Sequence, residues 1–223
     1  MAIGTLAGCL DALHNGVTTI LDHFHAAHTP AHFDAALRAT TESGARVVWA
    51  PACQTPPTAL FPTPKWESGA ETAKWQLEKF QALGGNLRPD GRVTLGLAYD
   101  VLSVGDAEVH RGFVDAARKA GVGTITAHVL NNQGFSIDKW HETGLIGPHL
   151  VFSHCCNLQG RTAMDDAEWA VLKESGAGIS STPEDELGMA HGHPVGLEAQ
   201  ERGVKCGLGV VSACYSHRLR SCC

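Results

Sequence analysis

The sequence predicts an α/β fold built as an incomplete (β/α)8 TIM-like barrel, in which strands 2–8 are present and strand 1 and helix 8 are missing. Helical segments repeatedly end at a glycine, and a short β-branched, apolar strand follows almost at once. The expected strands begin near residues 17, 45, 92, 122, 149, 177 and 204, and five of the six intervals span 27–30 residues. One βα unit of such a barrel takes about 30 residues. Strands that alternate with helices in this way favour a parallel sheet.

Each expected strand has its own local signal. Glycine after a helix adopts the left-handed conformation at no steric cost, and Gly16, Gly44 and Gly121 hold that place. The expected strands are 17–21, 45–49, 92–98, 122–127, 149–153, 177–181 and 204–210. The one long interval contains 54–65, which is rich in Pro and Thr and which we interpret as an insertion loop on the functional face.

The intervening segments carry helix signals. Leu6, Leu10 and Leu13 form an apolar stripe that predicts a helix at the start of the chain. Residues that favour helix starts precede three later segments: Thr29 with Pro30, Asp106, and the capping-box pattern of Asp165 with Glu168. Residues 1–210 are expected to form one partial barrel, and 211–223 an irregular tail.

Composition excludes several classes of function. The 223 residues include 17 Lys and Arg against 23 Asp and Glu, a formal charge of −6, and 43% are apolar. There is no cluster of basic residues that would predict nucleic-acid binding, and no apolar run long enough to span a membrane. The first residues lack the basic start of a signal peptide, which predicts a cytoplasmic protein.

Histidine is unusually frequent, with 13 residues, and this excess indicates a metal or proton-transfer site. Two histidines occupy equivalent positions, since His128 follows the strand at 122–127 and His154 follows the strand at 149–153. Catalytic groups of a barrel lie at the carboxyl ends of its strands. We therefore predict that His128 and His154 bind a divalent metal. The 8 cysteines contain no Cys-x-x-Cys and are expected to act mostly as small buried groups.

Other candidates follow the strand ends. Glu184, as a proton shuttle, and His193 are candidate catalytic residues, and His191 is a candidate substrate contact. A helix-entry role for Glu184 and a loop role for both histidines are the alternatives. Trp49 could stack on a substrate ring or pack in the core. His23 and His25 lie on one side of an extended segment, where they either bind metal or decorate a loop.

An ordered set of motifs resembles a known family. The segments are 15–23 (NGVTTILDH), 125–128 (ITAH), 151–154 (VFSH) and 179–194 (ISSTPE through HGHP). This order resembles the metal-dependent amidohydrolase superfamily, in its cytosine deaminase and chlorohydrolase-like branch. The likeness covers roughly residues 3–210 and is closest to fungal amidohydrolase-related proteins often found near secondary-metabolite genes.

The resemblance implies a barrel enzyme that hydrolyses carbon–nitrogen bonds, other than peptide bonds, of a small molecule through metal-activated water. His128 matches the family's ligand on strand 5, and His154 matches its ligand on strand 6. Zinc is the expected metal, with iron as the alternative.

Three departures from the family pattern weaken the expected site. The strand-1 His-x-His is absent, Val211 stands where the family has an Asp ligand, and Asn131 stands where many deaminases have a Glu. The chain therefore looks truncated at both ends, and we expect weak metal binding with slow hydrolysis or none. The alternatives are a non-catalytic remnant or regulatory subunit that pairs with itself or with a full-length relative, and a lyase or isomerase on the same barrel.

Overall fold

The computed structural model describes residues 1–52, 57–59, 61–63, 65–66, 69–101, 106–130, 136–159 and 163–210. The chain folds as two compact units. The first consists of Met1–Val101 and Gly112–Ile125, and the second of the described residues in Leu102–Arg111 and Thr126–Cys223.

Seven strands alternate with helices in the order that the sequence predicts, which confirms the fold class of an incomplete (β/α)8 barrel. The sheet order is β1-β2-β5-β6-β7-β8-β9, and the pairs β1–β2, β2–β5, β7–β8 and β8–β9 are parallel. The bounds are β1 (Ile20–Phe24), β2 (Val47–Pro51), β5 (Val93–Ala98), β6 (Thr124–Val129), β7 (Leu150–His154), β8 (Gly178–Ser181) and β9 (Lys205–Leu208).

The helices fall between these strands. They are α1 (Ala2–His14), α2 (Pro30–Ser43), α3 (Gly69–Leu83), α4 (Ala107–Lys119), α5 (Ile137–Glu142), η1 (Cys156–Gln159), α6 (Ala163–Ser175), α7 (Pro183–Gly188) and α8 (Gly196–Glu201). Part of the expected insertion loop forms an antiparallel pair, β3 (Pro57–Ala59) with β4 (Lys65–Trp66), while 54–56, 60 and 64 lie outside the described residues. None of the described helices has the length and apolar character that crossing a membrane requires.

The strands begin one to three residues later than the sequence predicts, and the first strand shows why. The amide of Val17 still donates to Ala12 O at 3.0 Å, so the turn that ends α1 includes the first expected strand residue. Pairing starts at Ile20, whose amide donates to Arg46 O and which lies opposite Val47.

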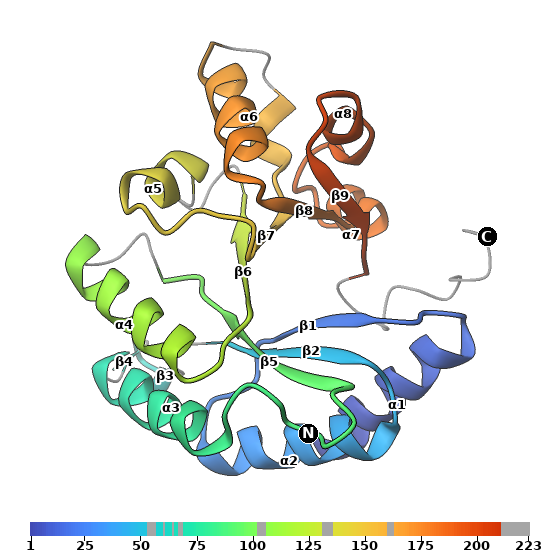
Figure 1. The fold of residues 1–223 in the computed structure, drawn as a ribbon, viewed down its shortest axis with the longest axis vertical. Coiled ribbons are helices and arrows are strands. Elements are labelled where there is room, and N and C mark those ends of the chain that lie inside the picture. Colours follow the sequence, from blue (N-terminus) through green and yellow to red (C-terminus); the bar gives the residue numbers. More distant parts are fainter. Residues whose placement is uncertain are drawn as a thin grey trace. The chain divides into compact units, whose positions relative to one another are not determined.

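The first unit packs its helices on one face of its strands, as α1, α2 and α3 lie along one side of β1, β2 and β5 (Figure 1). Helix α2 begins as predicted, because the Thr29 side chain accepts from the His32 amide at 3.2 Å. It carries Phe33 into an edge-on contact with Trp49 at 4.6 Å between ring centroids, and Phe33 also lies 6.2 Å from Phe80. These three rings are fully buried and form the centre of this core.

The second unit has a smaller aromatic core, in which Trp140 of α5 lies edge-on to Phe152 of β7 at 5.8 Å. The capping box predicted at 165–168 is wrong, since α6 already begins at Ala163. The buried Glu168 carboxylate instead accepts from the Ile137 amide at 3.0 Å and from Asn157 Nδ2 at 3.1 Å. A side chain of α6 thus satisfies an amide at the start of α5.

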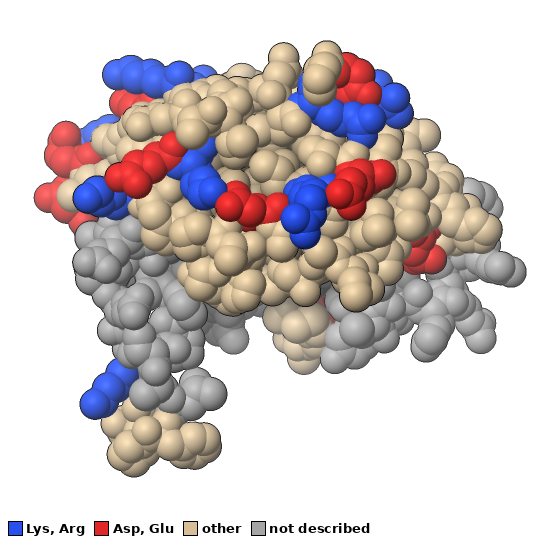
Figure 2. Space-filling view, turned by 90° about the horizontal axis from the view of Figure 1, so that it is seen from below, with Lys and Arg blue, Asp and Glu red and all other residues tan. Residues whose placement is uncertain are grey.

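Charged side chains of both signs are interleaved on the face shown in Figure 2. Lys79 of α3 pairs with Asp34 of α2 at 2.7 Å, and Asp90 accepts from both Arg88 and Arg92. Exposed pairs of this kind contribute about 0–1 kcal/mol each, so they add little to the stability of the fold.

A close backbone approach in the first unit gives a sharp test of the fold. Gly121 has a φ of +106°, and a β-carbon there would lie 2.6 Å from Gly85 Cα. Alanine at this position would clash with the backbone of Gly85 and would also have to adopt a left-handed conformation. We therefore expect Gly121→Ala to lower the free energy of unfolding by about 3 kcal/mol or more. Urea denaturation measures this. Gly123→Ala, where an added β-carbon meets nothing within 4 Å, is the matched control.

Asp22, in the middle of β1, makes stability depend on pH. Burial raises the pKa of its carboxyl above the usual range, to about 6. The folded state therefore holds a proton that the unfolded state releases, and stability falls as pH rises from about 4 to about 6, by at most about 3 kcal/mol. We expect Asp22→Asn to remove this fall in urea denaturation at pH 4.5 and 7.5. The same change at the exposed Asp115 should leave the difference between the two pH values intact; an unchanged pH dependence in Asp22→Asn contradicts the assignment.

Candidate metal centre

The second unit brings the two predicted metal ligands together. His128 lies at the end of β6 and His154 at the end of β7, and these strands are neighbours in the sheet. Their ring centroids are 5.3 Å apart. Two imidazoles on one tetrahedral zinc, with bonds of about 2.0–2.1 Å, place their ring centroids roughly 5 Å apart. The spacing therefore fits a shared ion, and imidazole nitrogen is a donor that zinc accepts readily.

The backbone at His154 is unusual for residues that are not glycine. His154 has a φ of 74° and Cys155 a φ of 56°, so two consecutive residues are left-handed. Each costs about 1–3 kcal/mol unless the surroundings compensate. The Cys155 amide turns back to donate to Val129 O at 3.0 Å, which ties the end of β7 to the end of β6. This turn brings the His154 side chain to the end of the strand where His128 lies.

A buried carboxylate holds the His154 ring. Glu186 of α7 is fully buried, and its Oε1 lies 3.4 Å from His154 Nδ1. The Thr182 amide donates to the same oxygen at 2.7 Å, and Ser181 Oγ donates to Oε2 at 3.1 Å. Desolvation by burial raises the pKa of Glu186, but the bonds from His154, Thr182 and Ser181 outweigh it, and the net pKa is lowered. Glu186 is thus a carboxylate at neutral pH.

Glu186 is the residue that sequence reasoning missed. The sequence favours Glu184, but that side chain is exposed on α7, whereas Glu186 faces inward. The feature of the sequence that could have identified Glu186 is the start of α7. Thr182 is the N-cap residue with Pro183 next, and an acid in the first turn often reaches back to the N-cap amide. Glu186 makes that bond from one position further along.

Two further predicted site residues, His191 and His193, belong to this unit. His191 is half-buried, and its ring centroid lies 5.3 Å from that of His154. Desolvation and the neighbouring His154 lower the pKa of His191, so its ring is neutral at pH 7. His193 is exposed.

The first unit also holds two neighbouring histidines, His23 and His25. His23 Nε2 lies 3.0 Å from Asp100 Oδ2, and the rings of His23 and His25 are 4.6 Å apart. One ring nitrogen of His23 and one ring nitrogen of His25 lie within 4.8 Å of each other, a distance that a shared ion or a shared ligand could bridge. The paired carboxylate orients His23, which is what a ligand or a proton-transfer group requires.

Trp49 lies in the core of the first unit and not at an open surface. It is fully buried, with Phe33 edge-on at 4.6 Å and Phe24 at 6.0 Å between ring centroids. No face of the ring is left for a ligand to stack on, and the burial favours the packing role that was the alternative for this residue.

The two cysteines that follow His154 are not thiolates at neutral pH. Burial raises the pKa of Cys155 well above its usual range and raises that of Cys156 to about 12. Only a thiolate binds metal well. The imidazoles are therefore the better donors in this region.

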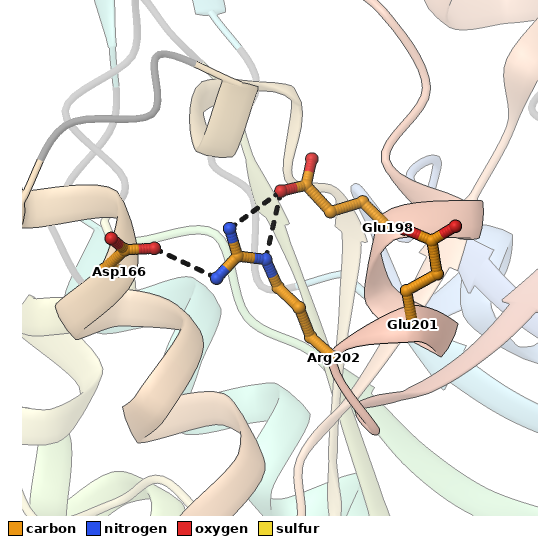
Figure 3. A pocket seen from close by; sticks show the side chains of 4 residues that line it. All are labelled: Asp166, Glu198, Glu201 and Arg202. Carbon is orange, nitrogen blue, oxygen red and sulfur yellow. Dashed lines mark hydrogen bonds and ion pairs between the residues drawn. The ribbon is translucent and has the colours of Figure 1, made fainter.

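The surface of the second unit has a hollow of about 440 Å³ that is lined by residues other than the predicted site residues. It is lined by Asp166, Glu198, Glu201 and Arg202, and none of the predicted site residues borders it (Figure 3). Arg202 donates to Asp166 and Glu198 at 3.0 Å each, while its guanidinium lies 5.2 Å from the Trp169 ring centroid. The Arg202 guanidinium thus joins a carboxylate of α6 to one of α8, which fits a structural role.

Comparisons with known proteins point to deaminases. The chain is 26% identical over 228 residues to a 5-methylthioadenosine/S-adenosylhomocysteine deaminase of Symbiobacterium thermophilum, an alignment that covers 97% of this chain and 47% of that protein. It is 33% identical over 78 residues to the enzyme of the same name from Syntrophobacter fumaroxidans, covering 35% of this chain and 16% of that one. No protein-family model matches the sequence.

Solved structures share the fold. They include an amidohydrolase from a Sargasso Sea sample (TM-score 0.68, 19% identity, 94% of this chain and 48% of that one). A zinc-bound adenosine deaminase of Xanthomonas campestris has a TM-score of 0.70 at 17% identity, over 98% and 47% of the two chains. The zinc complex of atrazine chlorohydrolase from Arthrobacter aurescens also reaches 0.70, at 16% identity over 95% and 48%. The chain thus spans about half the length of these proteins, shares the fold of amidohydrolases, and is similar in sequence to deaminases.

Proposed function

We propose that the chain carries the metal-binding half of a hydrolase that cleaves carbon–nitrogen bonds of a small molecule, in the cytosine deaminase and chlorohydrolase-like branch of the amidohydrolases. The observation that carries the proposal is the 5.3 Å spacing of the His128 and His154 rings at the ends of neighbouring strands. Two of the relatives are named deaminases, which supports cleavage of carbon–nitrogen bonds, and a third is named a chlorohydrolase, which supports hydrolysis in general.

The proposed roles follow from the positions of the side chains. His128 and His154 would hold the ion, and zinc is the metal that suits two imidazoles. When bound, zinc acts as a Lewis acid that activates water at neutral pH. His191 is neutral and lies beside His154, so it can accept a proton or a hydrogen bond from a substrate.

Two imidazoles are fewer donors than a zinc ion takes in proteins, where four ligands are usual. We therefore expect this chain to bind one zinc ion with a Kd in the micromolar range and not tighter. His128→Ala and His154→Ala should each weaken binding at least tenfold, as measured by isothermal titration calorimetry.

His141→Ala removes an exposed imidazole from α5 of the same unit and is the matched control. It should leave the Kd unchanged, because His141 is not one of the two proposed ligands. This control tests whether the many histidines bind zinc nonspecifically. Binding that survives both ligand substitutions would contradict the proposed centre, and so would a Kd far below micromolar that does not depend on them.

A second candidate function is pairing with another chain, as a regulatory subunit or as one half of a completed barrel. In the described residues β1 and β9 are the end strands of the sheet, and each has one strand neighbour. Open strand edges favour association with further strands. Ile3 and Leu10 of α1 are also exposed, at 87% and 49%.

This second candidate predicts association in solution. Sizing with multi-angle light scattering at 5–50 µM should show a mass above that of one chain, and Ile3→Glu together with Leu10→Glu should reduce it. A monomer at every concentration counts against self-pairing, and it leaves a longer relative as the partner to test by co-expression.

A further inference from the structure

The buried carboxylate of Glu186 fixes the direction of the hydrogen bonds around it. An ionised carboxylate accepts hydrogen bonds and donates none. Its Oε1 already accepts the Thr182 amide at 2.7 Å, and its Oε2 accepts Ser181 Oγ at 3.1 Å. Any further polar group that faces this carboxylate must therefore bring its own proton.

Two further groups do face it. Thr182 Oγ1 lies 3.4 Å from Glu186 Oε1, and His154 Nδ1 lies 3.4 Å from the same oxygen. Thr182 Oγ1 and His154 Nδ1 are 3.0 Å apart. If the hydroxyl donates its one proton to Glu186, it can only accept from His154, and both contacts of Nδ1 then require a proton on Nδ1.

Resting on the proposed function, we propose that Glu186 and Thr182 are positioning residues that hold His154 as its Nδ1–H tautomer. In a neutral imidazole one nitrogen carries the proton and the other carries the lone pair. With the proton on Nδ1, the lone pair is on Nε2, which is the nitrogen that neither Glu186 nor Thr182 engages. Ligand histidines commonly donate their other ring N–H to a carboxylate in this way.

His154 and Cys155 are both left-handed, so the rotation of the ring is not set by an ordinary strand end. Glu186 reaches the ring from α7, and Thr182 reaches it from the turn that follows β8. Both come from the same short segment, whose start is fixed by the Thr182–Glu186 backbone bond. The segment that positions the ring is thus itself locked.

The first measurement needs no metal. Long-range ¹H–¹⁵N NMR spectra of the metal-free protein at pH 8.5, with the His154 signals identified by their loss in His154→Ala, report which ring nitrogen carries the proton. We expect Nδ1–H for the wild type. A ring protonated on Nε2 overturns the proposal.

The second measurement is zinc affinity by calorimetry in paired variants. Thr182→Val removes the bridging hydroxyl and Thr182→Ser keeps it; Glu186→Gln removes the acceptor-only group, and Glu201→Gln makes the same change at an exposed position of α8. We expect Thr182→Val and Glu186→Gln to raise the Kd by about 10–100-fold and to reduce the Nδ1–H fraction, with Thr182→Ser and Glu201→Gln like the wild type.

The outcomes separate this proposal from the proposed function. If His154→Ala abolishes zinc binding but Thr182→Val and Glu186→Gln change neither the Kd nor the tautomer, the positioning role is wrong and the metal centre stands. If the tautomer shifts in both variants but His154→Ala leaves zinc binding intact, the positioning role stands and the metal centre is wrong. Should Glu186→Gln fail to fold by circular dichroism, the wild-type spectrum and the Thr182 pair still decide.

Discussion

The hydrogen bond from the Thr182 amide to the Glu186 carboxylate is the contact on which the candidate site depends. It begins α7, and it places a fully buried carboxylate beside His154. A buried charge is costly unless donors surround it, and here the donors are a backbone amide, a hydroxyl and an imidazole. Removal of the carboxylate would leave those donors unsatisfied. The same contact therefore stabilises the start of a helix and sets the chemistry of a neighbouring ring.

The alternation of strands and helices explains why these groups meet at all. Parallel strands bring their carboxyl ends to the same edge of a sheet, so His128 near the end of β6, His154 at the end of β7 and Thr182 just after β8 lie on successive neighbours. Side chains far apart in sequence then face one another without any long loop. The left-handed turn at His154 and Cys155 adds the final adjustment, because it directs one ring toward both His128 and α7.

The fold class and the meeting of His128 and His154 at neighbouring strand ends could be predicted from the sequence, because both follow from local patterns, whereas metal binding by the two histidines stays a prediction. Glycine after each helix, β-branched strands and regular spacing are properties of neighbouring residues. Strand starts were predicted up to three residues early, since the bond from Val17 to Ala12 extends the end of α1 into the expected strand. Such bonds depend on how the helix ends and are invisible in the apolar pattern.

Long-range partners explain the rest. Glu168 looks like a local capping residue, but its partners are Ile137 and Asn157, which a reading of the helix start alone does not reveal. Trp49 looks accessible at the end of a strand until Phe33 of α2 is placed edge-on against it. Glu184 and Glu186 differ by two positions on one short helix, so a rotation of about 200° separates an exposed acid from a buried one. Which of two acids faces the histidines is thus decided by the direction in which α7 leaves β8, a property of the assembled fold and not of either residue.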